Sequence, residues 1–99
     1  MSIADLTTFK QFLRELTADL DDPLQMALDS ATSECNHFVG FDIEDEFGTG
    51  IPADLEMACM TLAQVHADIG DPVTNENRRA AAQRLMLPYR RETGIGAAA

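Results

Sequence analysis

Apolar residues recur every three or four positions along most of this chain, which is the spacing of a helix with one buried face. The clearest run lies between Ile51 and Gly70. Its apolar stripe consists of Leu55, Ala58, Leu62, Val65 and Ile69. Four more apolar residues widen the stripe: Met57, Cys59, Met60 and Ala63. A helix that is apolar nearly all round is usually buried, so we expect a long central helix on which the other elements pack.

The ends of this segment carry residues that are typical of helix boundaries. Pro52 suits the first turn, where its missing N–H leaves no donor unpaired. Asp54 and Glu56 place negative charge at the positive end of the helix dipole. Gly70 suits a left-handed residue at the C-terminal end, and an Asp-Pro pair follows it. The pattern therefore predicts a helix from Pro52 to Gly70.

Two helices are predicted before the central one. The first covers about residues 5–16, and Asp5 or Thr7 suits its N-cap. The second covers residues 23–38, starts with a proline behind two aspartates, and ends at Gly40. Both have apolar residues at helical spacing along one face.

A last helix is predicted over about residues 76–87, and Pro88 ends it. Two polar stretches separate the predicted helices. Residues 41–50 contain four acidic side chains and two glycines, and they are predicted to form a loop. Residues 71–77 contain one proline and two asparagines, and they are predicted to form a turn.

The chain is expected to form one all-α domain, because 99 residues provide a single modest core and no internal repeat is present. We predict a small bundle of four helices over residues 1–92, followed by a flexible, disordered tail over residues 93–99. No apolar run approaches the roughly 20 residues that span a bilayer, and no signal-peptide pattern opens the chain. We therefore expect no membrane contact. The two cysteines, both in predicted helices, fit reduced thiols in a cytosolic protein better than a disulfide framework.

The formal net charge of −10 argues against nucleic-acid binding as the main task, because neutralising phosphates requires lysine and arginine. Residues 1–47 carry eleven acidic and two basic side chains, a net charge of −9. Residues 77–99 carry five arginines and one glutamate, a net charge of +4. Such a chain can bind copies of itself or a partner through complementary patches. A solvated surface without a partner is the alternative, and charge alone does not separate the two.

The basic segment contains the candidates for partner binding. Arginine is favoured at protein interfaces, and Tyr89 follows the proline that is expected to end the last helix. We therefore expect Tyr89 and Arg90 to leave the core and project as an anchor. The candidates are Arg78, Arg79, Pro88, Tyr89, Arg90 and Arg91. The alternative is that these arginines only keep the surface solvated.

The remaining patterns do not indicate a metal-binding or catalytic site. The possible soft-metal ligands are Cys35, His37, Cys59 and His66. Their spacing matches no compact zinc motif, so we interpret them as structural. The acidic 41–50 stretch lacks the order of a calcium-binding EF-hand loop and is interpreted as solvated. With neither a glycine-rich phosphate loop nor a nucleophile turn, the chain is predicted not to be an enzyme and to need no cofactor.

One segment is more specific, the closing Leu-x-x-Pro-Tyr-Arg sequence at residues 85–90. Three predicted helices precede it in a fixed order, each with characteristic positions. These are Leu6, Lys10, Leu13 and Arg14 in the first helix, Leu24, Leu28 and Ala31 in the second, and Pro52, Leu55, Ala58 and Leu62 in the central one. This arrangement resembles the head–tail connector (adaptor, or head-completion) proteins of tailed bacteriophages and prophages. Many members end the long helix with a tyrosine and an arginine, where this chain has His66 and Asp68.

The resemblance implies a small, mostly helical virion protein that is made in the cytoplasm of the bacterial host. Such proteins form a homo-oligomeric ring beneath the portal protein at the head–tail junction, extend the DNA channel, and offer a surface to a tail-side completion protein. They are not enzymes. Carboxylates on the channel wall would let viral DNA pass without sequence-specific binding. The acidic candidates for facing the channel or a neighbour are Asp42, Glu44, Asp45 and Glu46.

A competing interpretation is a small acidic regulatory protein, such as a DNA mimic that occupies a basic partner. A DNA mimic should spread its carboxylates evenly. A ring subunit should instead carry complementary patches at opposite ends, since a heterologous contact can close a ring. The arginine-rich end of this chain, residues 78–91, favours the connector.

Overall fold

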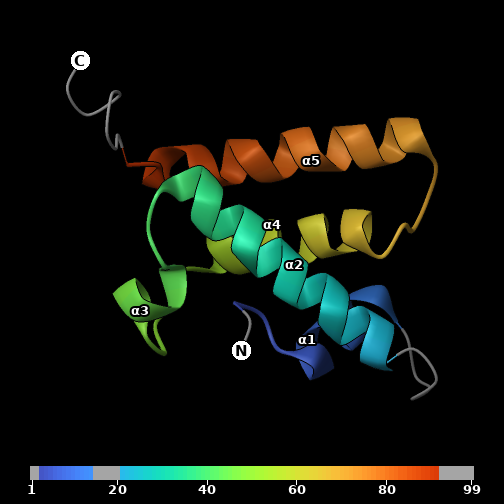
Figure 1. Cartoon of the computed structure of the whole chain (residues 1–99), viewed down its shortest axis with the longest axis horizontal. Coiled ribbons are helices and arrows are strands. Elements are labelled where there is room, and N and C mark those ends of the chain that lie inside the picture. Colours follow the sequence, from blue (N-terminus) through green and yellow to red (C-terminus); the bar gives the residue numbers. More distant parts are fainter. Residues whose placement is uncertain (1–2, 15–20, 92–99) are drawn as a thin grey trace.

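Helix α4 (Ala53–His66) is the element on which the larger helices pack (Figure 1). The structure, a computed structural model, describes residues 3–14 and 21–91. α4 contacts both α2 (Asp21–Val39) and α5 (Pro72–Met86). Its buried side chains are Leu55, Ala58, Cys59, Met60, Leu62 and Ala63. The prediction of a buried central helix is confirmed, although Met57 is 42% exposed and faces solvent.

The elements in the described ranges are all helical and form the small all-α bundle that the sequence predicts. α2 crosses in front of α4, and α5 runs along one side of the molecule (Figure 1). α1 (Leu6–Leu13) lies near the N-terminal half of α2, whereas α3 (Ile43–Phe47) lies at the opposite end. A 3₁₀ turn, η1 (Leu87–Tyr89), extends α5. The C-terminal ends of α2 and α5 therefore meet at the same end of the bundle.

One continuous apolar core joins these helices. The largest fully buried side chains include Phe9, Leu28, Ile43, Leu55, Leu62 and Met86. They come from α1, α2, α3, α4 and α5, so every α-helix in the described ranges contributes to the same core. Removing a side chain of this size from water stabilises the fold by about 1.5–3 kcal/mol.

α4 is shorter than predicted at both ends. Pro52 has an extended backbone and is the N-cap, not a residue of the first turn. At the other end, the Asp68 N–H donates to Val65 O and the Ile69 N–H donates to Gln64 O, both at 3.0 Å. These two bonds, with Asp68 at φ +58°, are those of a Schellman motif. A left-handed aspartate, not the glycine that follows it, therefore ends the helix.

α5 begins at Pro72, not near residue 76. Asp71 is its N-cap, and the carboxylate of Asp71 accepts a hydrogen bond from the Thr74 N–H at 2.7 Å. Pro72 occupies the first turn, where its fixed φ suits a helix. The prediction of a polar turn over residues 71–77 is wrong, because the Asp-Pro pair starts α5 and only a short link precedes it.

The predicted loop over residues 41–50 is also wrong, because it contains α3. The carboxylate of Asp42 caps this helix by accepting from the Asp45 N–H at 3.0 Å. Ile43 is fully buried, and its N–H donates to Asn36 Oδ1 at 2.9 Å. A cap and one buried side chain thus form a short helix in a stretch whose acidic composition predicts a solvated loop. The described ranges accordingly hold five α-helices where four were predicted.

Of the two predicted N-cap candidates of α1, Asp5 is the cap, since its carboxylate accepts from the Thr8 N–H at 2.7 Å. It ends at Leu13, because Arg14 adopts a left-handed conformation with φ +59°. The rest of the predicted first helix and the predicted tail over residues 93–99 lie outside the described residues. Within those residues, no helix combines the length and the apolar character needed to cross a bilayer.

We expect Leu62→Ala to lower the free energy of unfolding by about 2–5 kcal/mol, because it leaves a cavity between helices. Leu62 is fully buried on α4. Met57→Ala on the same helix is the matched control and should change stability by less than about 1 kcal/mol, since Met57 faces solvent. Urea unfolding followed by circular dichroism measures both. Equal losses in the two variants would contradict the central position of α4.

Candidate interaction surfaces

One carboxylate joins the three largest helices of the fold. Glu34 on α2 accepts from Arg79 on α5 at both oxygens, with Nε–Oε2 at 2.8 Å and Nη2–Oε1 at 3.0 Å. Its Oε1 also lies 2.8 Å from Nε2 of His66, the last residue of α4. A bidentate arginine–carboxylate pair fixes orientation as well as distance. The Glu34 cluster (Glu34, His66 and Arg79) therefore sets how α2, α4 and α5 lie against one another.

The electrostatics of the Glu34 cluster favour the ionised pair. The hydrogen bond from Arg79 lowers the pKa of Glu34 below its ordinary value, and that from His66 adds to this effect. The same pair raises the pKa of Arg79. Arg79 is thus a half-buried structural residue of its own subunit, although the sequence makes it a candidate for partner binding.

Arg78, the next candidate, is likewise engaged within the subunit. Its Nη1 donates to the carbonyl oxygen of Ile69, and to Asn75 Oδ1 at 2.9 Å. A Cβ atom at Gly70 would lie only 2.8 Å from this nitrogen, and Gly70 has φ +96°. The Arg78 side chain therefore folds over the link between α4 and α5 and holds that link in place.

The C-terminal arm, residues 87–91, lies against the subunit and does not project from it. Tyr89 is half-buried, with its ring edge-on to Phe47 at a centroid distance of 6.3 Å. The Arg91 N–H donates to Val39 O at 2.7 Å, and the Arg90 guanidinium lies 5.0 Å from the centre of the Phe38 ring. The expectation that Tyr89 leaves the core is wrong, because Pro88 lies within η1, which turns the chain back over the end of α2 and packs Tyr89 on the core. Arg90 is exposed, as expected, but its side chain lies along the subunit surface.

The acidic and basic candidate residues meet at this end of the bundle. Glu46 Oε2 lies 3.0 Å from Arg91 Nη2, and the Arg91 guanidinium lies 4.0 Å from the centre of the Phe41 ring. Asp42 and Asp45 are exposed nearby, and Glu44 is half-buried. The acidic segment and the C-terminal end of the arginine-rich segment are distant in sequence but adjacent in space, whereas Arg78 and Arg79 lie near the start of α5. The inference that they form opposite ends of one subunit is wrong, since α2 and α5 both finish at this end.

The two cysteines are core residues. Cys35 on α2 and Cys59 on α4 are fully buried, and Thr32 Oγ1 lies 3.7 Å from Cys59 Sγ. The neighbouring Cys59 thiol and burial raise the pKa of Cys35, so its thiol stays protonated at neutral pH. His37 is exposed, and His66 belongs to the Glu34 cluster. Across the described ranges, no group of three or more His, Cys, Asp or Glu side chains is placed to hold a metal ion.

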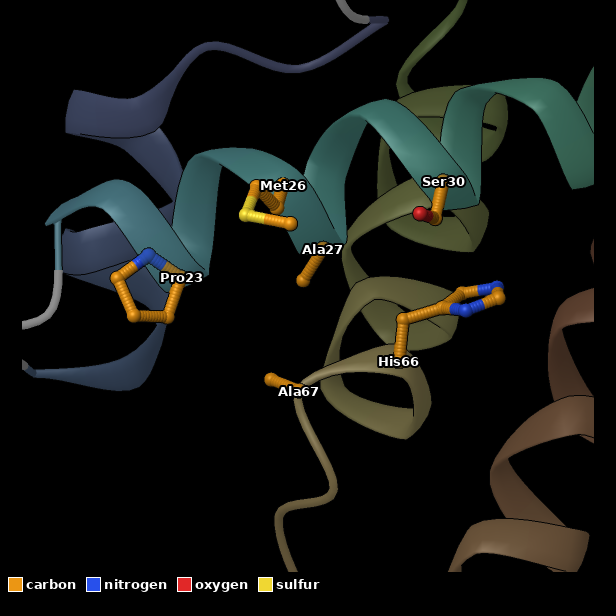
Figure 2. A pocket seen from close by; sticks show the side chains of 6 residues that line it. All are labelled: Pro23, Met26, Ala27, Ser30, His66 and Ala67. Carbon is orange, nitrogen blue, oxygen red and sulfur yellow. The ribbon is translucent and has the colours of Figure 1, made fainter.

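A hollow of about 290 Å³ lies between the N-terminal half of α2 and the end of α4 (Figure 2). It is lined by Pro23, Met26, Ala27, Ser30, His66 and Ala67. Ser30, His66 and Glu34 are the residue types of a hydrolase triad, but in the described structure no hydrogen bond joins Ser30 to His66. Ser30 also lies in the middle of α2, where backbone N–H groups bond within the helix and cannot form an oxyanion hole. The geometry is that of a surface recess.

A second hollow, of about 320 Å³, lies near the other end of α2, against α5. It is lined by Phe38, Ala80, Gln83, Arg84 and Leu87. Its wall is mostly aliphatic and aromatic, with Arg84 as the charged group. This composition suits contact with an apolar side chain that has a carboxylate next to it on the same surface.

No family model, curated protein or solved structure matches the chain.

The residues that organise these surfaces were not apparent from sequence. Glu34 stands among mediocre helix formers on α2, and nothing in its spacing indicates that residues 32 and 45 positions later reach it. Asn36 is a weak helix former by residue type, yet its side chain accepts the hydrogen bond from the Ile43 N–H at the start of α3. Arg79 and His66 are candidates for polar contacts by residue type, but the sequence does not show that both contact Glu34.

We expect Glu34→Gln to lower the free energy of unfolding by about 1 kcal/mol at pH 7, a modest value because Arg79 is 42% exposed. The pKa of Glu34 is lowered in the folded state, so its contribution is present above its ordinary value of 4.5 and is lost as pH falls through the lowered value. The stability difference between wild type and variant should therefore shrink in acid. Urea unfolding at a series of pH values measures it.

The control for this experiment is Asp29→Asn, an exposed carboxylate on the same helix that accepts from the uncharged Gln25 side chain at 2.9 Å. It should change stability by less than about 0.5 kcal/mol. A Glu34→Gln effect that stays constant down to acid pH would show that the ionised pair does not hold the helices.

Proposed function

We propose that this chain is a structural subunit of the head–tail junction of a tailed phage or prophage. Copies of it would form a ring below the portal protein, extend the DNA channel and receive a tail-side completion protein. The chain would have no catalytic role and no cofactor. This proposal rests on the resemblance of residues 85–90 and the preceding helical segments to the connector family.

The geometry of the closing segment is the observation that supports the proposal most. Its apolar residues anchor it, since Met86 is fully buried and Leu85 packs on the core. Leu87, Pro88 and Arg90 of this segment are exposed on the surface, and so is Arg91, which follows it. The Arg90 and Arg91 guanidiniums rest on the rings of Phe38 and Phe41, which limits their motion. A positioned arginine edge of this kind suits a protein interface, because little side-chain freedom remains to be lost on binding.

The charge of the chain is consistent with a DNA channel. DNA has to slide through such a ring without adhering, and carboxylates repel its phosphates. Asp42 and Asp45 at the start of α3 are exposed and suit this role. Glu46 suits it less well, because it is already paired with Arg91.

An acidic regulator that mimics DNA is the competing class. Such a protein needs a broad acidic surface, which the net charge of −10 would allow. In this structure, however, Arg91 neutralises part of the most acidic segment, and Arg84 and Arg90 are exposed at the same end of the bundle. These cations would repel a basic partner, so we favour the connector.

We expect self-association that rises with protein concentration and weakens with added salt, because exposed charge pairs are screened beyond about 8 Å at physiological ionic strength. Sedimentation velocity over a concentration series, at low and at high salt, measures it. The chain should also bind the portal protein encoded in the same genome and add a ring with a central hole in electron micrographs. A chain that stays monomeric, both alone and with the portal, would refute the connector.

A further inference from the structure

Two large apolar side chains stand out on the surface at different ends of α2. Met26, near its start, is 69% exposed. Leu87, in η1 beyond the other end, is 57% exposed and forms part of the second hollow. Exposed apolar side chains that are rimmed by charge are typical of interaction sites.

Met26 lies between two carboxylates. Asp22 and Asp29 are four residues before it and three residues after it, so all three share one face of α2. All three are exposed, and Met26 is one of the side chains that line the first hollow (Figure 2). This acidic face (Asp22, Met26 and Asp29) presents one flexible apolar side chain flanked by two negative charges. Methionine adapts its shape readily to an apolar recess.

The second hollow has the opposite character. Phe38, Ala80 and Leu87 provide apolar walls. Arg84 lies in its lining, and Arg90 lies beside it over the Phe38 ring. This basic hollow (Phe38, Ala80, Gln83, Arg84 and Leu87, with Arg90 at its edge) thus presents an apolar recess beside two positive charges.

We propose that the acidic face of one copy of this chain binds the basic hollow of the next copy. Met26 enters the recess, and the carboxylates of Asp22 and Asp29 approach the guanidiniums of Arg84 and Arg90. The occupant is a second copy, because the acidic face supplies both the apolar side chain and the two charges that the hollow matches. This inference rests on the proposed function and identifies the contact between neighbouring subunits.

The positions of the two surfaces make the contact heterologous. Met26 and Phe38 are twelve residues apart on α2, a separation of about 18 Å along the helix. Because different surfaces meet, each copy keeps one free acidic face and one free hollow after pairing, so the contact repeats and closes into a ring where the rotation allows. The Glu46–Arg91 pair plays no part in it, since it is satisfied within one subunit.

The test uses two variants that each remove one surface, Met26→Arg and Leu87→Asp. Arginine at position 26 would face Arg84, and aspartate at position 87 would place a charge in the apolar recess. Each variant alone should associate at least about 30-fold more weakly than wild type, the loss expected for a buried anchor. Mixed in equal amounts, they should form a one-to-one dimer that grows no further, because together they hold one intact acidic face and one intact hollow. Sedimentation velocity and native mass spectrometry measure both results.

Val73→Arg is the control, because Val73 is 66% exposed on α5 and belongs to neither surface. It should assemble like wild type, and circular dichroism should show all three variants folded.

Met26→Arg and Leu87→Asp variants that assemble like wild type, or a mixture of the two that stays monomeric, would overturn this interface without contradicting the proposed connector function. Variants that self-associate normally but lose portal binding would assign the two surfaces to the portal and also overturn it. Wild type that neither self-associates nor binds the portal would overturn both proposals.

Discussion

The fold depends on covering α4 on two sides. This helix is apolar over most of its circumference, and only a strip around Met57 faces water. A single neighbouring helix could bury one stripe of it and would leave Leu55 or Leu62 partly hydrated. α2 and α5 together cover it, and α1 and α3 complete the core with Phe9 and Ile43. The burial is non-directional, however, so it does not by itself fix how the covering helices are placed.

Directional contacts supply that placement. The Glu34 carboxylate reaches both Arg79 and His66, which relates α2 to α5 and α4 at one position along each helix. Asn36 performs a similar task for α3 by accepting from the Ile43 N–H. Hydrogen bonds to charged groups contribute more than neutral ones, and they are lost when the geometry shifts by an ångström or so. We therefore regard the apolar core as the source of stability and the polar cluster as the source of a defined arrangement.

The packing of the helices also decides which charged residues neutralise each other and which stay available to a partner. The acidic segment around α3 and the basic arm are brought together and partly neutralise each other through Glu46 and Arg91. The charges left for partners lie elsewhere, on the exposed face of α2 around Met26 and beside the hollow around Leu87. An assembly built on these surfaces would use the first half of α2 as one contact point and the junction of α2 with α5 and η1 as the other, with the Glu34 cluster holding the helices between them. That organisation suits a repeating structural subunit better than an isolated regulator.

The sequence by itself determined the all-α class, the buried central helix and the structural role of both cysteines, because these follow from local spacing and hydrophobicity, and it limited the first N-cap to Asp5 or Thr7. It did not reveal α3, because the single buried Ile43 that holds this helix is set among four carboxylates. It also misplaced the start of α5, where an Asp-Pro pair that suits the end of one helix equally suits the start of the next. Which charges meet was decided only by the tertiary structure. Glu34 with Arg79, and Glu46 with Arg91, are each 45 residues apart, and no local rule relates side chains at that separation until the helices between them are packed.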